Sequence, residues 1–301
     1  MPRRLNRGLF FPVSARLDQE AVAMSRITKA LEMAKADRAF LSIVEGPKNG
    51  PPHPARELKS EAPDHDSGFF PPPVEVEFRQ TRVVKVLKED LLRNRIVALD
   101  QSSEAAECFN HLRTRLFQRT RLAGWNTVQI TSFGVGEGKS TLAANLAVSI
   151  ARDTRQTTLL VELDFRRPSL ARLLGLGPEC LGLKSYFFDQ TPLQKLFVSP
   201  GIKKLAMLPA GGRVESPAEL LGSSKMEALI SELKHRYRDR YIIFDTPAIS
   251  LCPDPLIISE YVDSVIMVAR NGWTTRDSIR AAAEKIARDK FLGVLMNEAM
   301  E

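Results

Sequence analysis

The chain contains the stretch Thr131-Ser-Phe-Gly-Val-Gly-Glu-Gly-Lys-Ser-Thr141, between a strand-like segment at 127–131 and a helix-like segment at 139–151. Glycines in such a loop let the backbone approach an anion and turn its N–H groups inward. The helix that follows adds the positive end of its dipole. A glycine-rich loop in this position predicts a phosphate-binding loop.

Two side chains of this loop have predicted roles. Lys139 can reach the outer phosphates of a nucleotide, and the Ser140 hydroxyl can bind a magnesium ion. The strict pattern has glycine six residues before the lysine, where this chain has Phe133, with Gly134 one place later. The alternative is an ordinary glycine loop with a helix cap. We predict that ATP with Mg²⁺ binds here, with nucleotide contacts from Gly136, Glu137, Gly138, Lys139, Ser140 and Thr141.

A second motif, Leu159-Leu-Val-Glu-Leu-Asp-Phe-Arg-Arg-Pro168, has two acids at alternate positions near the end of a strand. Alternation puts Glu162 and Asp164 on one side of the strand, so both carboxylates could face the phosphates and the metal from the next strand. Without the phosphate loop, an acidic strand end before a turn at Pro168 would be the favoured interpretation.

A third motif, Tyr241-Ile-Ile-Phe-Asp-Thr-Pro247, is an apolar strand that ends in one carboxylate. Burying an acid there is costly unless it meets a metal or a donor. Asp245 is therefore the predicted partner of Ser140 around magnesium. The alternative is an aspartate that caps a loop.

Strands and helices alternate from about residue 102 to the end. Several strand candidates are continuous apolar runs, as expected for strands covered on both faces. The pattern predicts an α/β fold with a doubly wound, mostly parallel sheet and helices on both faces. The strand candidates are 127–131, 158–162, 204–208, 241–245, 264–268 and 292–296, and the helix candidates are 104–118, 139–151, 226–237 and 275–288.

The N-terminal third has a different composition. Residues 46–74 hold eight of the nineteen prolines, which predicts a linker. One short amphipathic helix is expected near 25–37. We predict a flexible region over 1–101 and a nucleotide-binding domain over 102–301.

Composition excludes several classes. The 301 residues are 44% hydrophobic and 26% charged, as in a globular protein. The net charge of +7 shows no clustering, so we expect no nucleic-acid partner. The spacing of Cys108, Cys180 and Cys252 disfavours a disulfide scaffold or a zinc site and favours the cytoplasm. No run reaches the roughly 18 to 20 apolar residues of a membrane helix.

The three motifs, in this order, resemble those of the bacterial tyrosine kinases (BY-kinases) of capsule and exopolysaccharide synthesis. These kinases are a branch of the P-loop class that also holds the partition and septum-site ATPases. The resemblance covers about residues 102–301. It extends to Glu107-Cys-Phe-Asn-His-Leu-Arg113, Leu208-Pro-Ala-Gly211, Ser216-Pro-Ala-Glu-Leu-Leu221 and Gly293-Val-Leu-Met-Asn297.

This resemblance implies an ATP-dependent tyrosine kinase that regulates polysaccharide polymerisation and export. It implies catalytic roles for Lys139, Glu162, Asp164 and Asp245, a metal held by Ser140 and Asp245, and an adenine contact from Asn297. The implied activator is a membrane-anchored protein of the polysaccharide co-polymerase type, which would hold the chain at the inner face of the plasma membrane. Assembly into a homo-oligomer is also implied.

The chain departs from the family at three places. Glu162 stands where the family usually has aspartate, which predicts slow phosphoryl transfer and faster transfer in Glu162→Asp. Asn110 replaces an arginine of a Glu-x-x-Arg-x-x-Arg pattern linked to ring assembly. No tyrosine cluster follows the last predicted strand before Glu301, so we expect no self-modification of a tail.

Two other functions compete with the kinase. A partition-type ATPase switch usually carries a lysine early in the loop, where Phe133 or Gly134 stands. A binding module with a degenerate site would not need the intact Lys139, Ser140, Asp164 and Asp245.

Overall fold

The computed structural model describes residues 81–177, 180–236 and 240–297. The predicted helix near 25–37 and the predicted linker at 46–74 lie outside the described residues.

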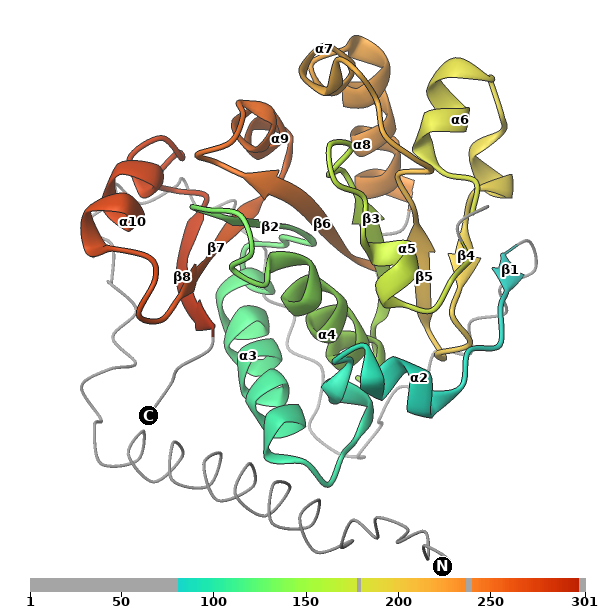
Figure 1. Ribbon diagram of the computed structural model, residues 1–301, viewed down its shortest axis with the longest axis horizontal. Helices are drawn as coiled ribbons and strands as arrows, with labels where there is room; N and C mark the ends of the chain where they lie inside the picture. The colour runs from blue at the N-terminus through green and yellow to red at the C-terminus, as the bar shows by residue number, and fades with distance from the viewer. Residues whose placement is uncertain (1–80, 178–179, 237–239, 298–301) are drawn as a thin grey trace, which may run out of the picture. The chain divides into compact units, whose positions relative to one another are not determined.

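The described residues form one eight-stranded sheet in the order β1-β4-β5-β3-β6-β2-β7-β8 (Figure 1). Neighbouring strands are parallel, except that β4 pairs with β5 in the antiparallel direction. The strands are β1 (Arg82–Val83), β2 (Thr127–Ser132), β3 (Thr157–Glu162), β4 (Val198–Ser199), β5 (Leu205–Leu208), β6 (Arg240–Ala248), β7 (Ser264–Arg270) and β8 (Phe291–Asn297).

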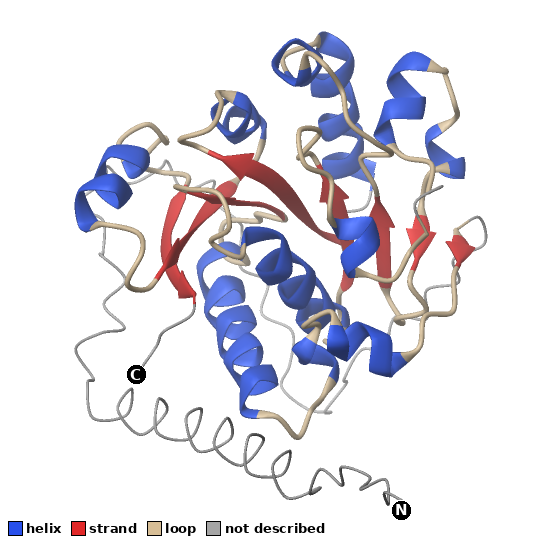
Figure 2. Ribbon diagram, viewed as in Figure 1, coloured by secondary structure: helices blue, strands red, loops and turns tan. Residues whose placement is uncertain are grey.

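Helices fill the connections between these strands (Figure 2). The α-helices are α2 (Lys88–Arg93), α3 (Glu104–Thr120), α4 (Lys139–Ala151), α5 (Leu170–Leu173), α6 (Leu183–Phe188), α7 (Pro217–Leu221), α8 (Ser224–Arg236), α9 (Asp254–Tyr261) and α10 (Arg276–Ala283), with 3-10 turns η1 (Val97–Leu99) and η2 (Leu193–Lys195).

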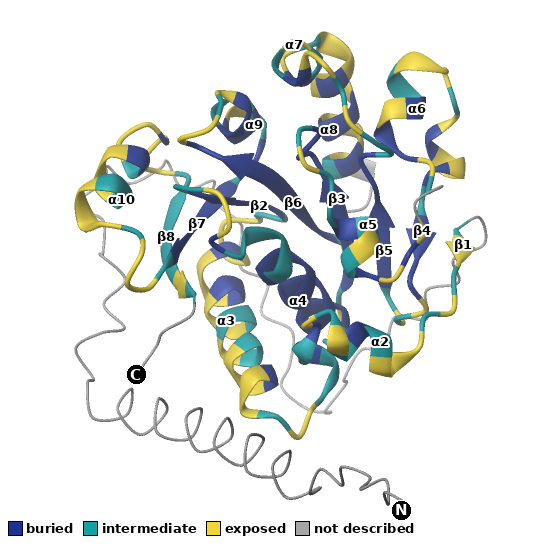
Figure 3. Ribbon diagram, viewed as in Figure 1, coloured by how far each residue is buried: buried dark blue, intermediate teal, exposed yellow. Residues whose placement is uncertain are grey.

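The sheet separates two hydrophobic cores, one on each face. On β6, Ile243 packs into the core that contains residues of α3 and α4. Its neighbours Ile242 and Phe244 pack into the core that contains residues of α8 and α9. Successive side chains of a strand point to opposite faces, so a strand covered on both faces is apolar throughout. The central strands are accordingly buried (Figure 3).

The predicted doubly wound sheet is confirmed, and each strand and helix predicted between residues 102 and 301 overlaps an observed one. The last predicted helix, 275–288, ends earlier, at Ala283. Beyond it the backbone bonds span three residues, from the Lys285 N–H to Ala282 and from the Ile286 N–H to Ala283, so the chain leaves the helix in tight turns.

The folded unit begins before the predicted boundary at 102. Leu91 and Ile96 are buried in the α3/α4 core. The Asn145 side chain of α4 accepts a hydrogen bond from the Ala98 N–H at 2.9 Å and donates one to the Arg95 carbonyl at 2.8 Å. The elements β1, α2 and η1 have only 2, 6 and 3 residues, so they lack a periodic sequence pattern. The boundary at 101/102 is therefore placed too late.

Candidate active site

The predicted phosphate loop connects the end of β2, at Ser132, to the start of α4, at Lys139. Gly136 and Gly138 have φ angles of 81° and 90°, in the left-handed region that favours glycine. Gly138 is also the N-cap of α4. The loop therefore places the free N–H groups of a thirteen-residue helix at the carboxyl end of a central parallel strand, where anions bind.

Lys139 lies between two carboxylates. Its Nζ is 3.1 Å from Oδ2 of Asp164, and the side chains of the two residues are 17% and 4% exposed. Burial acts to lower the pKa of Lys139, but the charges of Asp245 and Asp164 outweigh it and raise this pKa above its ordinary value. The other oxygen of Asp164, Oδ1, accepts a hydrogen bond from the Arg167 N–H at 2.9 Å. Lys139 is therefore cationic, and the carboxylate of its partner Asp164 is held in place by the Arg167 N–H.

Asp245 is fully buried in β6. Neither of its carboxylate oxygens has a hydrogen-bond partner among the described residues. Burial raises the pKa of Asp245 to about 7, although the Lys139 charge and the Ser140 hydroxyl act to lower it. An acid with two unsatisfied oxygens beside a lysine and a serine has the environment of a group that receives a cation when nucleotide binds.

Glu162 pairs with Asp245 across β3 and β6, but its carboxylate has different partners from those predicted. Oε1 accepts hydrogen bonds from the N–H groups of Ser169 at 2.5 Å and Leu170 at 2.6 Å. Oε2 accepts one from the Ala210 N–H at 3.1 Å. Burial raises the pKa of Glu162, and these three hydrogen bonds oppose the rise. Strand alternation could not show that backbone donors occupy the Glu162 carboxylate.

We expect Glu162→Asp to destabilise the protein rather than accelerate transfer. The shorter side chain withdraws the carboxylate from three buried N–H groups, and each unsatisfied group costs about 1–3 kcal/mol. Thermal unfolding of wild type and Glu162→Asp measures the loss, with Glu219→Asp on the exposed face of α7 as the control. A variant as stable as wild type, with faster transfer, would restore the original prediction for this residue.

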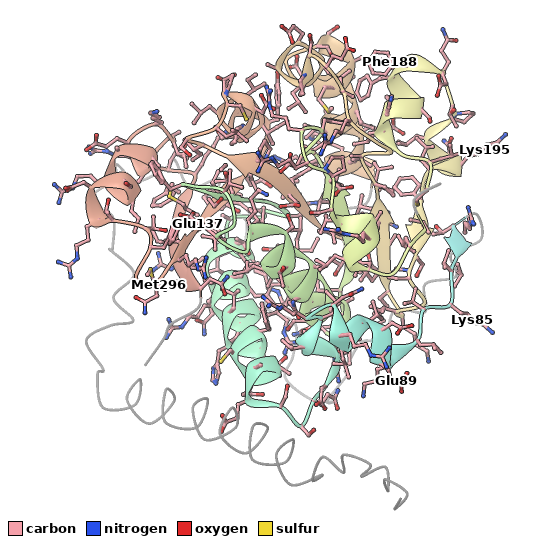
Figure 4. All side chains as sticks on the ribbon, in the orientation of Figure 1. Lys85, Glu89, Glu137, Phe188, Lys195 and Met296 are labelled. Atoms are coloured by element: carbon pink, nitrogen blue, oxygen red, sulfur yellow. The ribbon has the colours of Figure 1, made fainter. Side chains whose placement is uncertain are left out.

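Glu137, labelled in Figure 4, was predicted to contact nucleotide, and its side chain contacts the loop after β7. Its carboxylate is buried, and Oε1 accepts a hydrogen bond from the Thr274 hydroxyl. Its backbone carbonyl accepts one from Nδ2 of Asn297 at 2.9 Å. Asn297, the predicted adenine contact, thus binds the phosphate loop itself. Thr274 escaped the sequence reasoning because a threonine after a strand carries no distinctive signal.

A partly buried ion pair was also missed. Arg166, two residues after Asp164, donates to both oxygens of Asp254 at 2.8 Å and 3.0 Å. Asp254 is fully buried at the start of α9. The pair joins the turn after β3 to the helix after β6, so it fixes the turn that carries Asp164. The arginines after the second motif were visible in the sequence, but their partner was not.

The residues present fit a magnesium ion. Among the described residues, no cluster of three or more His, Cys, Asp or Glu side chains could hold a metal. Mg²⁺ in nucleotide sites does not require such a cluster, because it is bound by one or two protein oxygens, several waters and the phosphates. Ser140, at the start of α4, and the buried oxygens of Asp245 would supply those protein ligands.

A mostly parallel sheet with a glycine-rich loop that leads from a central strand into a helix defines a P-loop NTPase. No model of a known protein family matches the chain. The chain is 32% identical over 207 residues, 68% of this chain and 86% of the relative, to the tyrosine-protein kinase YwqD of Bacillus subtilis (strain 168). It therefore belongs to the bacterial tyrosine kinase family, whose members are ATP-dependent phosphotransferases.

Two further similarities agree with this membership. The chain is 29% identical over 215 residues to the succinoglycan biosynthesis transport protein ExoP of Rhizobium meliloti (strain 1021), covering 68% of this chain and 26% of ExoP. Its fold matches the crystal structure of the chimerical protein CapA2B2 with a TM-score of 0.62 and 27% identity, over 73% of this chain and 94% of that one.

Proposed function

We propose that this chain is a protein-tyrosine kinase that uses MgATP and regulates the polymerisation and export of an exopolysaccharide or capsule. The observation that carries the proposal is the position of Lys139 between Asp164 and the unsatisfied Asp245, at the start of the helix that follows the phosphate loop. The similarity to a tyrosine kinase and to a polysaccharide transport protein supports it over a partition-type ATPase switch.

Each residue then has a role in phosphoryl transfer. Backbone N–H groups of residues 136–141 bind the phosphates, and Lys139 leaves Asp164 to stabilise the charge on the γ-phosphate. Ser140 and Asp245 would hold Mg²⁺, which would supply positive charge to the phosphate oxygens. Asp164, held by the Arg167 N–H, orients the tyrosine hydroxyl and accepts its proton as the phosphoryl group moves to the tyrosine oxygen and ADP is released.

A membrane-anchored protein of the polysaccharide co-polymerase type is the proposed activator. The match to ExoP supports this, because the chain corresponds to only 26% of that longer transport protein. No helix within the described ranges is both long and apolar enough to cross a bilayer. Such an activator would hold the chain at the inner face of the plasma membrane.

We also propose that the chain assembles into a homo-oligomer. Residues of α3 that correspond to the family's ring-assembly pattern have partners within the chain. Arg113 donates to the Ser149 carbonyl of α4 at 2.7 Å, and Asn110 donates to the Glu107 carboxylate at 2.9 Å. In any such ring, Arg113 would therefore already be hydrogen-bonded to Ser149 within its own subunit.

The test is transfer of label from γ-labelled ATP in the presence of Mg²⁺, with candidate tyrosine substrates and with a cytoplasmic fragment of a co-polymerase. We expect phosphotyrosine on a substrate protein and its loss when Mg²⁺ is chelated. Release of inorganic phosphate without phosphotyrosine in every combination would favour the ATPase switch. Failure of the wild-type chain to bind ATP would contradict both functions.

A further inference from the structure

Two side chains outside the phosphate loop converge on its residue Glu137. Asn297, the last residue of β8, donates through Nδ2 to the Glu137 carbonyl at 2.9 Å. Thr274, in the loop after β7, donates through its hydroxyl to Oε1 of Glu137. The same Thr274 oxygen accepts a hydrogen bond from the Arg270 N–H at 2.9 Å, which ties it to the end of β7. The loop is thus bound to two neighbouring strand ends.

The Asn297 contact fixes the direction of a peptide plane. In a planar trans peptide the carbonyl and the N–H point in opposite directions. When Asn297 holds the Glu137 carbonyl, the Gly138 N–H therefore points in the opposite direction, away from Asn297. An N–H in that direction is free to join the other backbone donors of the loop around an anion. Without Asn297, nothing among the described contacts would hold this plane.

Gly138 is adapted to this contact. A Cβ atom at position 138 would lie 2.0 Å from Nδ2 of Asn297, and the φ angle of +90° disfavours any other residue. The glycine is therefore needed for the approach of the asparagine as well as for its backbone conformation. The close packing and the hydrogen bond both involve Nδ2 of Asn297 and point to the same pairing.

The Thr274 contact fixes the side chain of Glu137. The Glu137 residue is 1% exposed, and its Oε2 has no hydrogen-bond partner among the described residues, so the Thr274 hydroxyl is the side-chain donor to this carboxylate. A Cβ at Gly134 would lie only 3.2 Å from Oε1, so the loop itself closes around the group. A carboxylate released from this position could turn toward the phosphates and repel them.

We propose that Asn297 and Thr274 are positioning residues that clamp the phosphate loop in its anion-binding conformation. This inference rests on the proposed use of ATP and deepens it. The clamp acts on the phosphates and not on the base, so its loss weakens every ligand that carries a polyphosphate by the same factor. A contact from Asn297 to adenine, as the sequence suggested, would instead change the preference between bases.

Thr274→Val is the sharpest test, because valine keeps the shape of threonine and removes the hydroxyl. Binding of ATP, GTP and inorganic tripolyphosphate should each weaken about three- to tenfold, the effect of losing one typical hydrogen bond. Thr274→Ser, which keeps the hydroxyl, should restore all three affinities. Thr275→Val is the matched control, because the adjacent hydroxyl caps α10 through the Ser278 N–H and should affect stability alone.

Asn297→Ala provides a second variant if Thr274→Val does not fold. It should weaken the same three ligands to a similar degree and leave the ratio of ATP to GTP affinity unchanged. The clamp is wrong if either variant binds tripolyphosphate as wild type does, or if Asn297→Ala changes mainly the ATP to GTP ratio. Wild-type protein that binds no ATP would contradict the proposed function, whereas unchanged binding in the variants would contradict only the clamp.

Discussion

Asp245→Asn is expected to lower the rate of phosphoryl transfer about 10²–10³-fold, the cost of removing one preorganised electrostatic group from a transition state. The substitution keeps the shape of the side chain and removes the charge that is proposed to hold Mg²⁺. Both carboxylate oxygens are buried without a geometric hydrogen-bond partner among the described residues, so the interaction that asparagine loses is chiefly the charge interaction with Lys139. Initial rates at saturating MgATP measure the effect. A fall of less than about tenfold would exclude this role.

The same variant should not be less stable than wild type in the absence of nucleotide. A buried carboxylate without donors is costly when it is charged, and asparagine removes that cost. Equal or higher melting temperature together with lost activity would separate catalysis from folding. A large loss of stability would mean that Asp245 supports the fold rather than the reaction.

Asp245 also makes the stability of the folded protein depend on pH. Burial raises its pKa to about 7 in the folded chain, so the folded state binds this proton more tightly than the unfolded state. The stability that this proton contributes is fully present below about pH 4 and is lost as the pH rises toward 7. Asp245→Asn lacks this contribution. The melting temperature of wild type relative to the variant should therefore fall between about pH 5 and about pH 7 and then level off.

The sheet could be predicted from sequence because its strands are buried on both faces. Runs such as Tyr241-Ile-Ile-Phe have no polar alternation, and the helices between them have a clear period, so both signals were strong. The elements that were missed are short. β1 and β4 have two residues each, and their positions depend on pairing with strands far away in the chain. Such pairing leaves little trace in a local pattern.

The candidate site could also be predicted from the sequence only in part. Lys139, Asp164 and Asp245 were expected to meet because loops at the carboxyl ends of adjacent parallel strands share one edge of the sheet. Partners that come from the backbone could not be anticipated, since any residue can donate an N–H. This is why the three donors to Glu162 were not foreseen, and why Asn297 was assigned to a base instead of a peptide carbonyl.

Lys139→Met is expected to weaken ATP binding about a hundredfold or more, because it removes the cation that faces the phosphates and leaves Asp164 and Asp245 beside them. A lysine that faces phosphate is not part of the core, so its replacement would ordinarily spare the fold. The ion pair with Asp164 argues otherwise. Breaking a buried pair by removing one partner costs about 3–5 kcal/mol, because it leaves an unpaired buried charge.

The double variant Lys139→Met/Asp164→Asn separates the two effects. Neutralising Asp164 removes the unpaired charge, so the double variant should regain most of the melting temperature that Lys139→Met loses. It should not regain ATP binding, because no cation replaces the lysine. The double-mutant cycle compares the wild type, both single variants and the double variant. For each protein, ATP binding is measured by titration and stability by thermal unfolding. Restored ATP binding in the double variant would show that Lys139 serves mainly to neutralise Asp164, and the phosphate-binding role would then pass to the backbone of the loop alone.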